Sequence, residues 1–351
     1  MSVLPLDNDR EHILEKTDRL WDDLRGSRIF ITGGTGFVGT WLMEAFVAAN
    51  RARGLGARAV LLSRDPAGFE RRAPHLAGDE SVSFVLGEAT SFELPGGEFD
   101  YVIHAATERT FAATPAQPLA ALEPDRIATR RVLDFAAERG VRRLLFTSSG
   151  AVYGRTGTGA DGISESSGSA PDPTQASAAY GESKRLSEYA CASYARVFGF
   201  HAVIARLFAF VGPYLPLDEG YAVGNFIGDV LAGRPIAIGG DGTPLRSYLY
   251  AADLSIWLWT MLLRGESGRA YNAGSPDAVS IRALADTIVE TLSPTTKVTL
   301  AGAALPGAAP NGYIPDTSRA ERELGLHAWI DLPEALRRTY AAHRPSTASK
   351  R

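Results

Sequence analysis

Tyr180 and Lys184 are the two side chains of this sequence whose types and spacing best suit proton transfer. They lie four residues apart in the segment 178–198, whose pattern predicts a helix, so they share one helical face. A neighbouring ammonium group favours a phenolate and lowers the phenol pKa from its ordinary value of about 10. Tyr180 would then be able to take a proton from a sugar hydroxyl or return it to a ketone. The same spacing also arises by chance on exposed helices, so a third partner is needed.

Ser149 supplies that partner. It follows the apolar run 143–147, which predicts a strand, and ligands of open parallel sheets bind at the strand ends. A serine hydroxyl there can hydrogen-bond the reacting oxygen and hold it for Tyr180. Serines at strand ends are often only caps or turn residues. The presence of Ser149, Tyr180 and Lys184 behind a glycine-rich turn, in this order, argues against a purely structural role.

The glycine-rich turn has the sequence Thr-Gly-Gly-Thr-Gly-Phe-Val-Gly at 32–39. It follows the apolar run 29–31 and opens a segment of helical apolar periodicity that continues to Val47. Glycines at 33, 36 and 39 allow a tight turn, a close approach of a pyrophosphate and packing of the helix on the strand. The helix N-terminus adds free N–H groups and a positive dipole end. The turn therefore predicts a dinucleotide site.

The elements that must position these residues alternate between strands and helices. Further apolar runs predict strands at 59–62, 82–86, 101–104, 143–147 and 202–205, and the clearest intervening helix covers 127–139. Continuous apolar strands separated by helices predict an α/β protein with a Rossmann-like, doubly wound parallel sheet. Beyond Arg206 glycines and prolines become frequent, which indicates a smaller C-terminal lobe.

Three other segments complete this outline. An apolar stripe over 9–25 predicts an amphipathic helix that covers the domain or serves a partner chain, and packing on the domain is the favoured role. The segment 154–173, rich in Gly, Ser, Thr and Pro, predicts a long mobile loop and candidate lid. The polar stretch 346–351 predicts a frayed end. We expect an N-terminal helical extension over 1–26, an NAD(P)-binding domain over 27–205, and a substrate lobe mainly over 206–345 that returns segments to the first domain.

Composition excludes several classes of function. The 351 residues are 45% apolar and 22% charged with a formal charge of -4, typical of a globular protein and unlike a nucleic-acid binder. Cys191 is the only cysteine, so no internal disulfide is possible, and a reducing, cytoplasmic location is expected. The six scattered histidines form no metal-ligand pattern. The most lipophilic stretch, 254–263, is too short to cross a bilayer and predicts a buried helix, so no membrane association is expected.

Together these motifs resemble the extended short-chain dehydrogenase/reductase family, in its NAD-dependent epimerase/dehydratase branch, which modifies nucleotide sugars. The resemblance spans roughly residues 27–340. It rests on the glycine turn at 32–39, His104-Ala105-Ala106, Ser148-Ser149 with Val152-Tyr153-Gly154, Tyr180 with Lys184, Arg206, Gly212-Pro213, 240–243, 246–253 and Tyr271-Asn272-Ala273-Gly274.

The resemblance implies roles for individual residues. Ser149, Tyr180 and Lys184 would form the catalytic triad, with Lys184 also bound to the nicotinamide ribose. NAD or NADP would be held by Gly33, Thr35, Gly36, Phe37, Val38, Ser63, Arg64, Glu88, Ala105, Ala106, Tyr180 and Lys184. A nucleotide-diphosphate sugar would be held by Ser149, Asn225, Phe226 and Arg246. The family also implies a homodimer, for which the helix over 178–198, with Leu186, Tyr189 and Tyr194, offers one candidate face.

Two departures from the family pattern concern the dinucleotide. Ser63 stands where NAD-preferring members place an Asp against the adenosine ribose, and Arg64 could meet a 2′-phosphate, so NAD and NADP both stay open. Glu88 replaces the Asp that contacts adenine in the family.

Other departures concern the sugar. Gly150 and Ala151 stand where sugar 4,6-dehydratases carry acidic residues, and nucleotide-sugar decarboxylases also carry an acid at the position of Ala151. Their absence argues against both reactions. Ala209 and Ser247 replace a common Asn and Asp, which leaves the sugar unidentified.

We therefore expect a nucleotide-sugar epimerase that acts at C4 through a 4-keto sugar and returns the same hydride. The alternative is an NADPH-dependent ketoreductase of a 4-keto-6-deoxy nucleotide sugar, which Arg64 favours. A 4,6-dehydratase and a non-catalytic dinucleotide sensor are less favoured, since the triad is complete but the acidic residues are missing.

Overall fold

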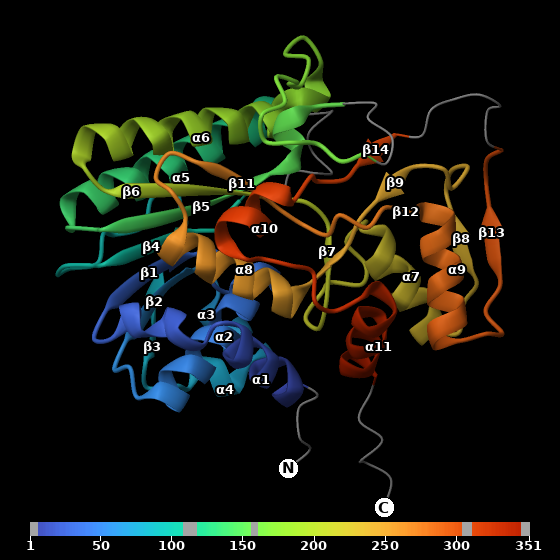
Figure 1. The fold of residues 1–351 in the computed structure, drawn as a ribbon, viewed down its shortest axis with the longest axis horizontal. Coiled ribbons are helices and arrows are strands. Elements are labelled where there is room, and N and C mark those ends of the chain that lie inside the picture. Colours follow the sequence, from blue (N-terminus) through green and yellow to red (C-terminus); the bar gives the residue numbers. More distant parts are fainter. Residues whose placement is uncertain (1–5, 108–117, 156–160, 304–310, 345–351) are drawn as a thin grey trace, which may run out of the picture.

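The computed structural model describes residues 6–107, 118–155, 161–303 and 311–344, and a parallel sheet of seven strands lies at the centre of this part (Figure 1). The strands are β1 (Arg28–Thr32), β2 (Arg58–Ser63), β3 (Val82–Leu86), β4 (Tyr101–His104), β5 (Arg143–Ser149), β6 (His201–Leu207) and β11 (Ala270–Ala273). Their order is β11-β6-β5-β4-β1-β2-β3, and every pairing is parallel. The predicted Rossmann-like fold class is confirmed, and β1 and β4 flank the point where the strand order reverses.

Helices cover both faces of this sheet (Figure 1). α5 (Pro118–Glu138) and α6 (Ala179–Phe198) lie on one face, and α2 (Phe37–Arg53) and α8 (Ala251–Arg264) lie on the other. Successive side chains of β1 serve the two layers in turn, as strand geometry requires. Ile29 and Ile31 join the core beneath α2 and α8, whereas Phe30 joins the core beneath α5.

The N-terminal segment forms two elements rather than the single helix expected over 9–25. They are α1 (Asp7–Lys16) and a 3-10 helix, η1 (Asp18–Leu24). Between them the Thr17 hydroxyl donates to the Ile13 carbonyl and accepts from the Trp21 indole N–H at 2.7 Å. Such side-chain bonds to the local backbone compete with regular helix continuation. Trp21 then packs on Trp259 of α8, with ring centroids 5.1 Å apart, so the extension covers the domain as expected.

Short strands and helices beyond β6 form a lobe at the carboxyl side of the sheet (Figure 1). They are β7 (Phe210–Val211), α7 (Ala222–Leu231), β8 (Ile236–Ile238), β9 (Leu245–Arg246), β10 (Leu249–Tyr250), β12 (Val279–Ser280), α9 (Ile281–Leu292), β13 (Val298–Leu300), β14 (Gly312–Tyr313) and α11 (Leu332–His343). The helix α10 (Ser318–Leu324) instead lies against β11 and α8 of the main domain (Figure 1). Two segments of this region return to the main domain, because β11 pairs with β6 and α8 packs on the sheet. The predicted buried helix over 254–263 lies inside α8. The remaining short helices, α3 (Pro66–Arg72) and α4 (Pro74–Ala77), connect β2 to β3.

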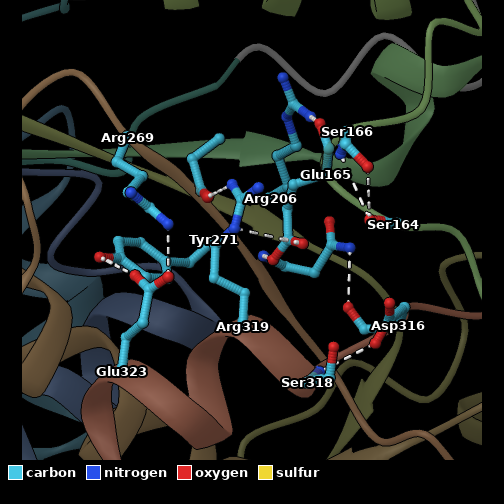
Figure 2. A network of polar contacts seen from close by, with 12 residues as sticks. Ser164, Glu165, Ser166, Arg206, Arg269, Tyr271, Asp316, Ser318, Arg319 and Glu323 are labelled. Carbon is cyan, nitrogen blue, oxygen red and sulfur yellow. Dashed lines mark hydrogen bonds and ion pairs between the residues drawn. The ribbon is translucent and has the colours of Figure 1, made fainter.

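The segment 161–173, which we call the strap, is anchored rather than loose. Ile163 forms an isolated bridge with Pro315 and donates its backbone N–H to the Ile314 carbonyl at 2.8 Å. The buried Glu165 carboxylate accepts from the backbone N–H of Asn272 at 2.9 Å and lies 3.7 Å from the Arg319 guanidinium (Figure 2). The prediction of a mobile loop is therefore wrong for the strap, because the buried Glu165 carboxylate binds this segment to β11 and α10. Residues 156–160 of that loop, and the predicted frayed end at 346–351, lie outside the described residues.

Two exclusions from composition can be checked against the described part of the chain. No helix there has the length and apolar character needed to cross a membrane. No group of three or more His, Cys, Asp or Glu side chains lies together as metal ligands would, within the same residues.

Candidate active site

The glycine turn between β1 and α2 is shaped to receive a phosphate group. Gly33 has φ +72°, and a Cβ there would lie 2.5 Å from the Ala105 carbonyl carbon; a Cβ at Gly39 would lie 2.2 Å from the Gly33 carbonyl oxygen. These two glycines are therefore required for packing. Gly36 differs, because a Cβ there would meet only the Gly33 carbonyl oxygen, at 3.4 Å. The missing side chain of Gly36 leaves open space in front of the helix.

That open space faces the start of α2. Gly36 is the N-cap of this helix and no side chain caps it, so the first N–H groups, including those of Phe37 and Val38, are available to an anion. The Phe37 ring stacks on Phe210, with centroids 5.3 Å apart, which fixes the helix start against the second lobe. The geometry fits the pyrophosphate of a dinucleotide.

The end of β2 forms the neighbouring edge of this site. The Ser63 hydroxyl lies 3.3 Å from the Thr35 hydroxyl, so the structure brings these two predicted cofactor residues together. The Asp65 carboxylate accepts from the Gly68 N–H at 2.8 Å and caps α3, which directs its charge to its own helix. The Arg64 side chain is exposed at the same edge, and Glu88 is exposed just beyond β3.

Ala105 and Ala106 follow β4 and lie beside the glycine turn. The Ala106 N–H donates to the Thr32 hydroxyl at 3.2 Å, and that hydroxyl also lies 2.7 Å from His104 Nδ1. Burial, assisted by the positive charge of Lys184, lowers the pKa of His104 to about 3. His104 is therefore a neutral link between β1 and β4, and it holds the two alanines in place.

Ser149, Tyr180 and Lys184 meet where β5 ends and α6 begins. The Ser149 hydroxyl hydrogen-bonds the Tyr180 phenol, and Lys184 Nζ lies 5.8 Å from the centroid of the Tyr180 ring. Removal from water raises the pKa of Tyr180 above its ordinary value, and the Ser149 hydrogen bond opposes this rise. The expectation that Lys184 gives an acidic phenol is thus wrong for the protein alone, because desolvation is the larger effect.

The ammonium group of Lys184 is enclosed by protein. Lys184 is only 3% exposed; its Nζ lies 3.4 Å from the Thr147 carbonyl oxygen and 3.8 Å from an Asp125 carboxylate oxygen. Burial lowers the pKa of Lys184, and the negative charge of Asp125 raises it again. Asp125 also accepts from the hydroxyls of Thr107 and Ser183, at 3.0 and 3.3 Å.

Sequence reasoning missed Asp125 because the helix was expected to begin at Ile127. In the structure α5 begins at Pro118, so Asp125 lies within the helix and faces α6. A helix predicted to start before residue 125 would have placed Asp125 on the helix and could have revealed this partner of Lys184.

Tyr313 is a second residue that the sequence did not reveal. Its phenol oxygen lies 3.4 Å from Ser149 Oγ, although 164 residues separate the two in the chain. β14 carries Tyr313 and pairs with β9, where Tyr313 is the register partner of Arg246. The Arg246 guanidinium carbon lies 5.8 Å from the centroid of the Tyr313 ring. Arg246 and Ser149, which the sequence assigned to the sugar nucleotide, are therefore linked through one aromatic ring.

The other predicted substrate residues lie on α7. Asn225 and Phe226 line a cavity of about 300 Å³ together with the glycine-rich segment 239–242 and Ile281. The side-chain oxygen of Asn225 is buried and accepts no hydrogen bond from the described residues. Arg246 Nη1 donates to the Leu245 and Asn311 carbonyls at 2.7 and 3.3 Å.

A buried ion pair between β6 and α6 contacts the carboxyl end of β5. Arg206 on β6 donates to both oxygens of Glu188 on α6, at 2.9 and 2.7 Å, and Glu188 also accepts from the Ser148 hydroxyl at 2.6 Å. Arg206 further donates to the Tyr153 phenol at 2.9 Å. Its guanidinium also faces the Glu165 carbonyl of the strap (Figure 2). The residue before Ser149 is thus fixed by charges on two neighbouring elements.

Known proteins resemble this chain in sequence and in fold. Residues 29–274 match the NAD dependent epimerase/dehydratase family. UDP-glucuronic acid decarboxylase 1 of Arabidopsis thaliana is 27% identical over 323 residues, which cover 90% of this chain and 70% of that protein.

Two solved structures show the same fold. A UDP-N-acetylglucosamine 4-epimerase of Methanobrevibacter ruminantium superposes with a TM-score of 0.78 at 20% identity, over 90% of this chain and 97% of that one. DesIV of Streptomyces venezuelae, a dTDP-glucose 4,6-dehydratase with NAD bound, gives a TM-score of 0.76 at 24% identity, over 90% and 96%. The family match covers most of the chain, and the glycine turn and the strand order agree with it. This protein therefore belongs to the NAD dependent epimerase/dehydratase family of enzymes.

Proposed function

We propose that this enzyme is a nucleotide-sugar epimerase that acts at C4 of the sugar. The observation that supports this most is the composition of the group around Ser149. Ser149, Tyr180 and Lys184 lie together, and no carboxylate stands at the two positions after the serine. Removal and return of a hydride and a proton need only these three side chains, whereas loss of water or carbon dioxide calls for further acid chemistry.

In this proposal the chain's residues hold and move one proton. Ser149 hydrogen-bonds the C4 oxygen, and Tyr180 takes the hydroxyl proton and later returns it to the ketone. Lys184, held between the Thr147 carbonyl and Asp125, binds a ribose hydroxyl of the dinucleotide. NAD, when bound at the glycine turn, would supply a hydride acceptor and donor. The 4-keto sugar would rotate in the site, so that the hydride returns to its other face.

The space after Ser149 supports epimerisation over the alternatives. A Cβ at Gly150 would lie 2.8 Å from both the Tyr313 phenol oxygen and the Phe208 ring. An acidic side chain at 150, as in dehydratases, would therefore have to displace an aromatic group. Decarboxylation is the second candidate, because the curated relatives are decarboxylases of UDP-glucuronic acid, but Ala151 offers no acid for it. The ketoreductase alternative rests on Arg64.

The second lobe supports a nucleotide-diphosphate sugar as substrate. A guanidinium group such as that of Arg246 binds diphosphate strongly through charge-assisted hydrogen bonds. The cavity beside Asn225 and Phe226 has room for a nucleoside, and the unpartnered Asn225 oxygen would accept a donor from a base. We assign Arg246 to the diphosphate and the cavity to the nucleoside end.

A homodimer is also proposed, formed by the outer faces of α5 and α6. Ile127, Leu186 and Tyr189 are exposed there, by 40%, 43% and 72%, whereas Tyr194 turns inward and donates to Asp134 of α5 at 2.6 Å. Leu186→Glu with Tyr189→Glu is expected to halve the mass measured by sedimentation. Leu86→Glu, at a leucine on β3 that is as exposed as Tyr189, serves as the control; a wild-type monomer would contradict the proposal. The cytoplasmic location expected from Cys191 stays a prediction.

Turnover of defined substrates tests the reaction. The purified enzyme would be given UDP-N-acetylglucosamine, dTDP-glucose and UDP-glucuronic acid without added cofactor, and products identified by NMR. A C4 epimer formed without loss of mass supports the proposal. Release of carbon dioxide from UDP-glucuronic acid would replace it with the decarboxylase. No turnover of these three sugars, together with stoichiometric oxidation of NADPH by a 4-keto-6-deoxy nucleotide sugar, would replace it with the ketoreductase.

A further inference from the structure

We propose that Tyr313 is a positioning residue of this active site, whose phenol donates a hydrogen bond to Ser149 and so directs the serine hydroxyl toward Tyr180 and the reacting sugar oxygen. The proposal rests on the proposed function of the Ser149–Tyr180 pair, but it concerns a residue that lies in a separate lobe.

The hydrogen-bond inventory of Ser149 leads to this role. A serine hydroxyl has one hydrogen to donate and two lone pairs that accept. Ser149 Oγ already accepts from the Ala151 N–H at 3.1 Å, and the Tyr313 phenol lies 3.4 Å away on another side. If both neighbours donate, the single hydrogen of Ser149 is left for the Tyr180 phenol in the free enzyme, and for the C4 oxygen when the sugar is bound beside it.

The direction of the Tyr313 bond follows from the state that the reaction requires. When Tyr180 carries a negative charge it is the strongest acceptor near Ser149, because hydrogen bonds to an ionised oxygen are about twice as strong as neutral ones. Ser149 then donates to Tyr180, and Tyr313 has to donate to Ser149. The backbone N–H groups of Gly150 and Ala151 also face the Tyr313 oxygen, which leaves its hydrogen to be donated. The Leu207 carbonyl oxygen, which also lies 3.4 Å from the Tyr313 phenol oxygen, is the other acceptor within reach of this hydrogen.

Packing holds Tyr313 in the orientation that this role needs. Its ring lies on Phe208 with centroids 4.7 Å apart, and the pairing of β14 with β9 fixes its backbone beside Arg246. The phenol oxygen reaches the strand end only because residue 150 is a glycine, since a Cβ there would lie 2.8 Å from it. Tyr313 thus connects the arginine assigned to the diphosphate with the serine assigned to the sugar.

Tyr313→Phe is the variant that tests the proposal, because it keeps the ring on Phe208 and removes only the hydroxyl. We expect kcat to fall about 5- to 10-fold, the value of one neutral hydrogen bond, with KM for the sugar nucleotide unchanged. The acidic limb of the kcat profile should move to higher pH, because a less well-aimed Ser149 stabilises the Tyr180 phenolate less.

Tyr101→Phe is the matched control. The Tyr101 phenol donates to the Asp23 carbonyl at 3.1 Å and accepts from the Arg142 guanidinium at 3.3 Å, at the opposite end of the sheet, so this variant also loses the partly buried hydrogen bonds of one phenol. It should leave kcat and the pH profile unchanged. NAD affinity, measured by calorimetry, should be unchanged in both variants.

A double variant and a spectroscopic measurement separate this inference from the proposed function. In a Ser149→Ala background, adding Tyr313→Phe should have no further effect, because Tyr313 acts through Ser149. The ¹³Cζ NMR signal of Tyr180, assigned with Tyr180→Phe, should move in Tyr313→Phe and not in Tyr101→Phe, whichever reaction the enzyme catalyses. An unmoved Tyr180 signal, or an equal loss of kcat with and without Ser149, would overturn the role of Tyr313.

Discussion

The dinucleotide site and the sugar-nucleotide site of this enzyme are built in different ways. The part of the proposed dinucleotide site that would receive the pyrophosphate is formed by one short stretch, Gly33 to Gly39, whose backbone N–H groups and missing side chains create the space. The proposed sugar-nucleotide site collects Ser149, Asn225, Arg246 and Tyr313 from separate elements. One site depends on absent side chains, and the other depends on side chains that distant segments bring together.

This difference predicts which kind of substitution should impair each site. An added side chain should disable the dinucleotide site, whereas the sugar-nucleotide site should be disabled by removing a functional group. Tyr180 lies between the two, next to Ser149 of one and Lys184 of the other. Changes at Tyr180 should therefore cause the largest loss, and the following variants test the two sites separately.

Tyr180→Phe should abolish proton transfer while leaving both binding sites intact. Loss of a general acid–base group costs about 10²- to 10⁴-fold, so we expect kcat to fall within this range. The affinity for NAD, measured by calorimetry, should stay within twofold of that of the wild type. Normal turnover by this variant would refute the assignment of Tyr180.

Gly36→Val should weaken NAD binding without unfolding the protein. The backbone at Gly36, with φ -81°, suits any residue, and its Cβ would have ordinary contacts only, so the new side chain points into the space for the pyrophosphate. Overpacking of this kind costs ~1–3 kcal/mol, so Kd for NAD should rise by up to about 100-fold. Gly96→Val, where a Cβ meets nothing, is the control for thermal stability and affinity. Unchanged NAD affinity in Gly36→Val would place the pyrophosphate elsewhere.

Arg246→Ala should affect the sugar nucleotide and spare the dinucleotide. Removal of a charge-assisted hydrogen bond to the diphosphate should raise KM about tenfold with little change in kcat. Arg234→Ala, at an exposed arginine of the same lobe that pairs with Asp229, should change neither value. A wild-type KM in Arg246→Ala would remove this residue from the site.

His104 should make stability, rather than binding, depend on pH. Its pKa is about 3 in the folded protein and about 6.5 when unfolded, so protonation favours the unfolded chain. The contribution of neutral His104 to the free energy of unfolding is fully present above pH 6.5. Below that pH the free energy of unfolding should fall by at most about 1.4 kcal/mol per pH unit. Urea titrations at pH 6.5 and 5.5 should show this slope, and His104→Asn should reduce it. An equal slope in both proteins would assign the pH dependence to other groups.

Sequence reasoning reached the dinucleotide site because its signals are local. The glycine turn, the strand before it and the helix after it lie within about twenty residues, and backbone preferences at Gly33 and Gly39 act over short distances. The strand pattern likewise indicated a parallel sheet, because buried strands are continuously apolar.

The rest of the site could not be predicted because it depends on contacts between distant segments. Tyr313 approaches Ser149 through the pairing of β14 with β9, and no periodicity marks a two-residue strand. The composition of the strap indicated a loose loop. In the structure the buried Glu165 carboxylate of the strap contacts Asn272 of β11 and Arg319 of α10, and these contacts hold the segment in place. The desolvation that raises the Tyr180 pKa is also a property of the assembled site.

Isotope retention at C4 tests the central claim most directly. The enzyme would be incubated, without added cofactor, with UDP-N-acetylglucosamine, dTDP-glucose and UDP-glucose, each carrying deuterium at C4. The account predicts a C4 epimer of at least one of these that keeps its deuterium, with no accumulation of reduced nicotinamide. A C4 epimer that has lost its deuterium to solvent, or conversion of these sugars only with an equal amount of added NAD or NADP being reduced, would contradict it.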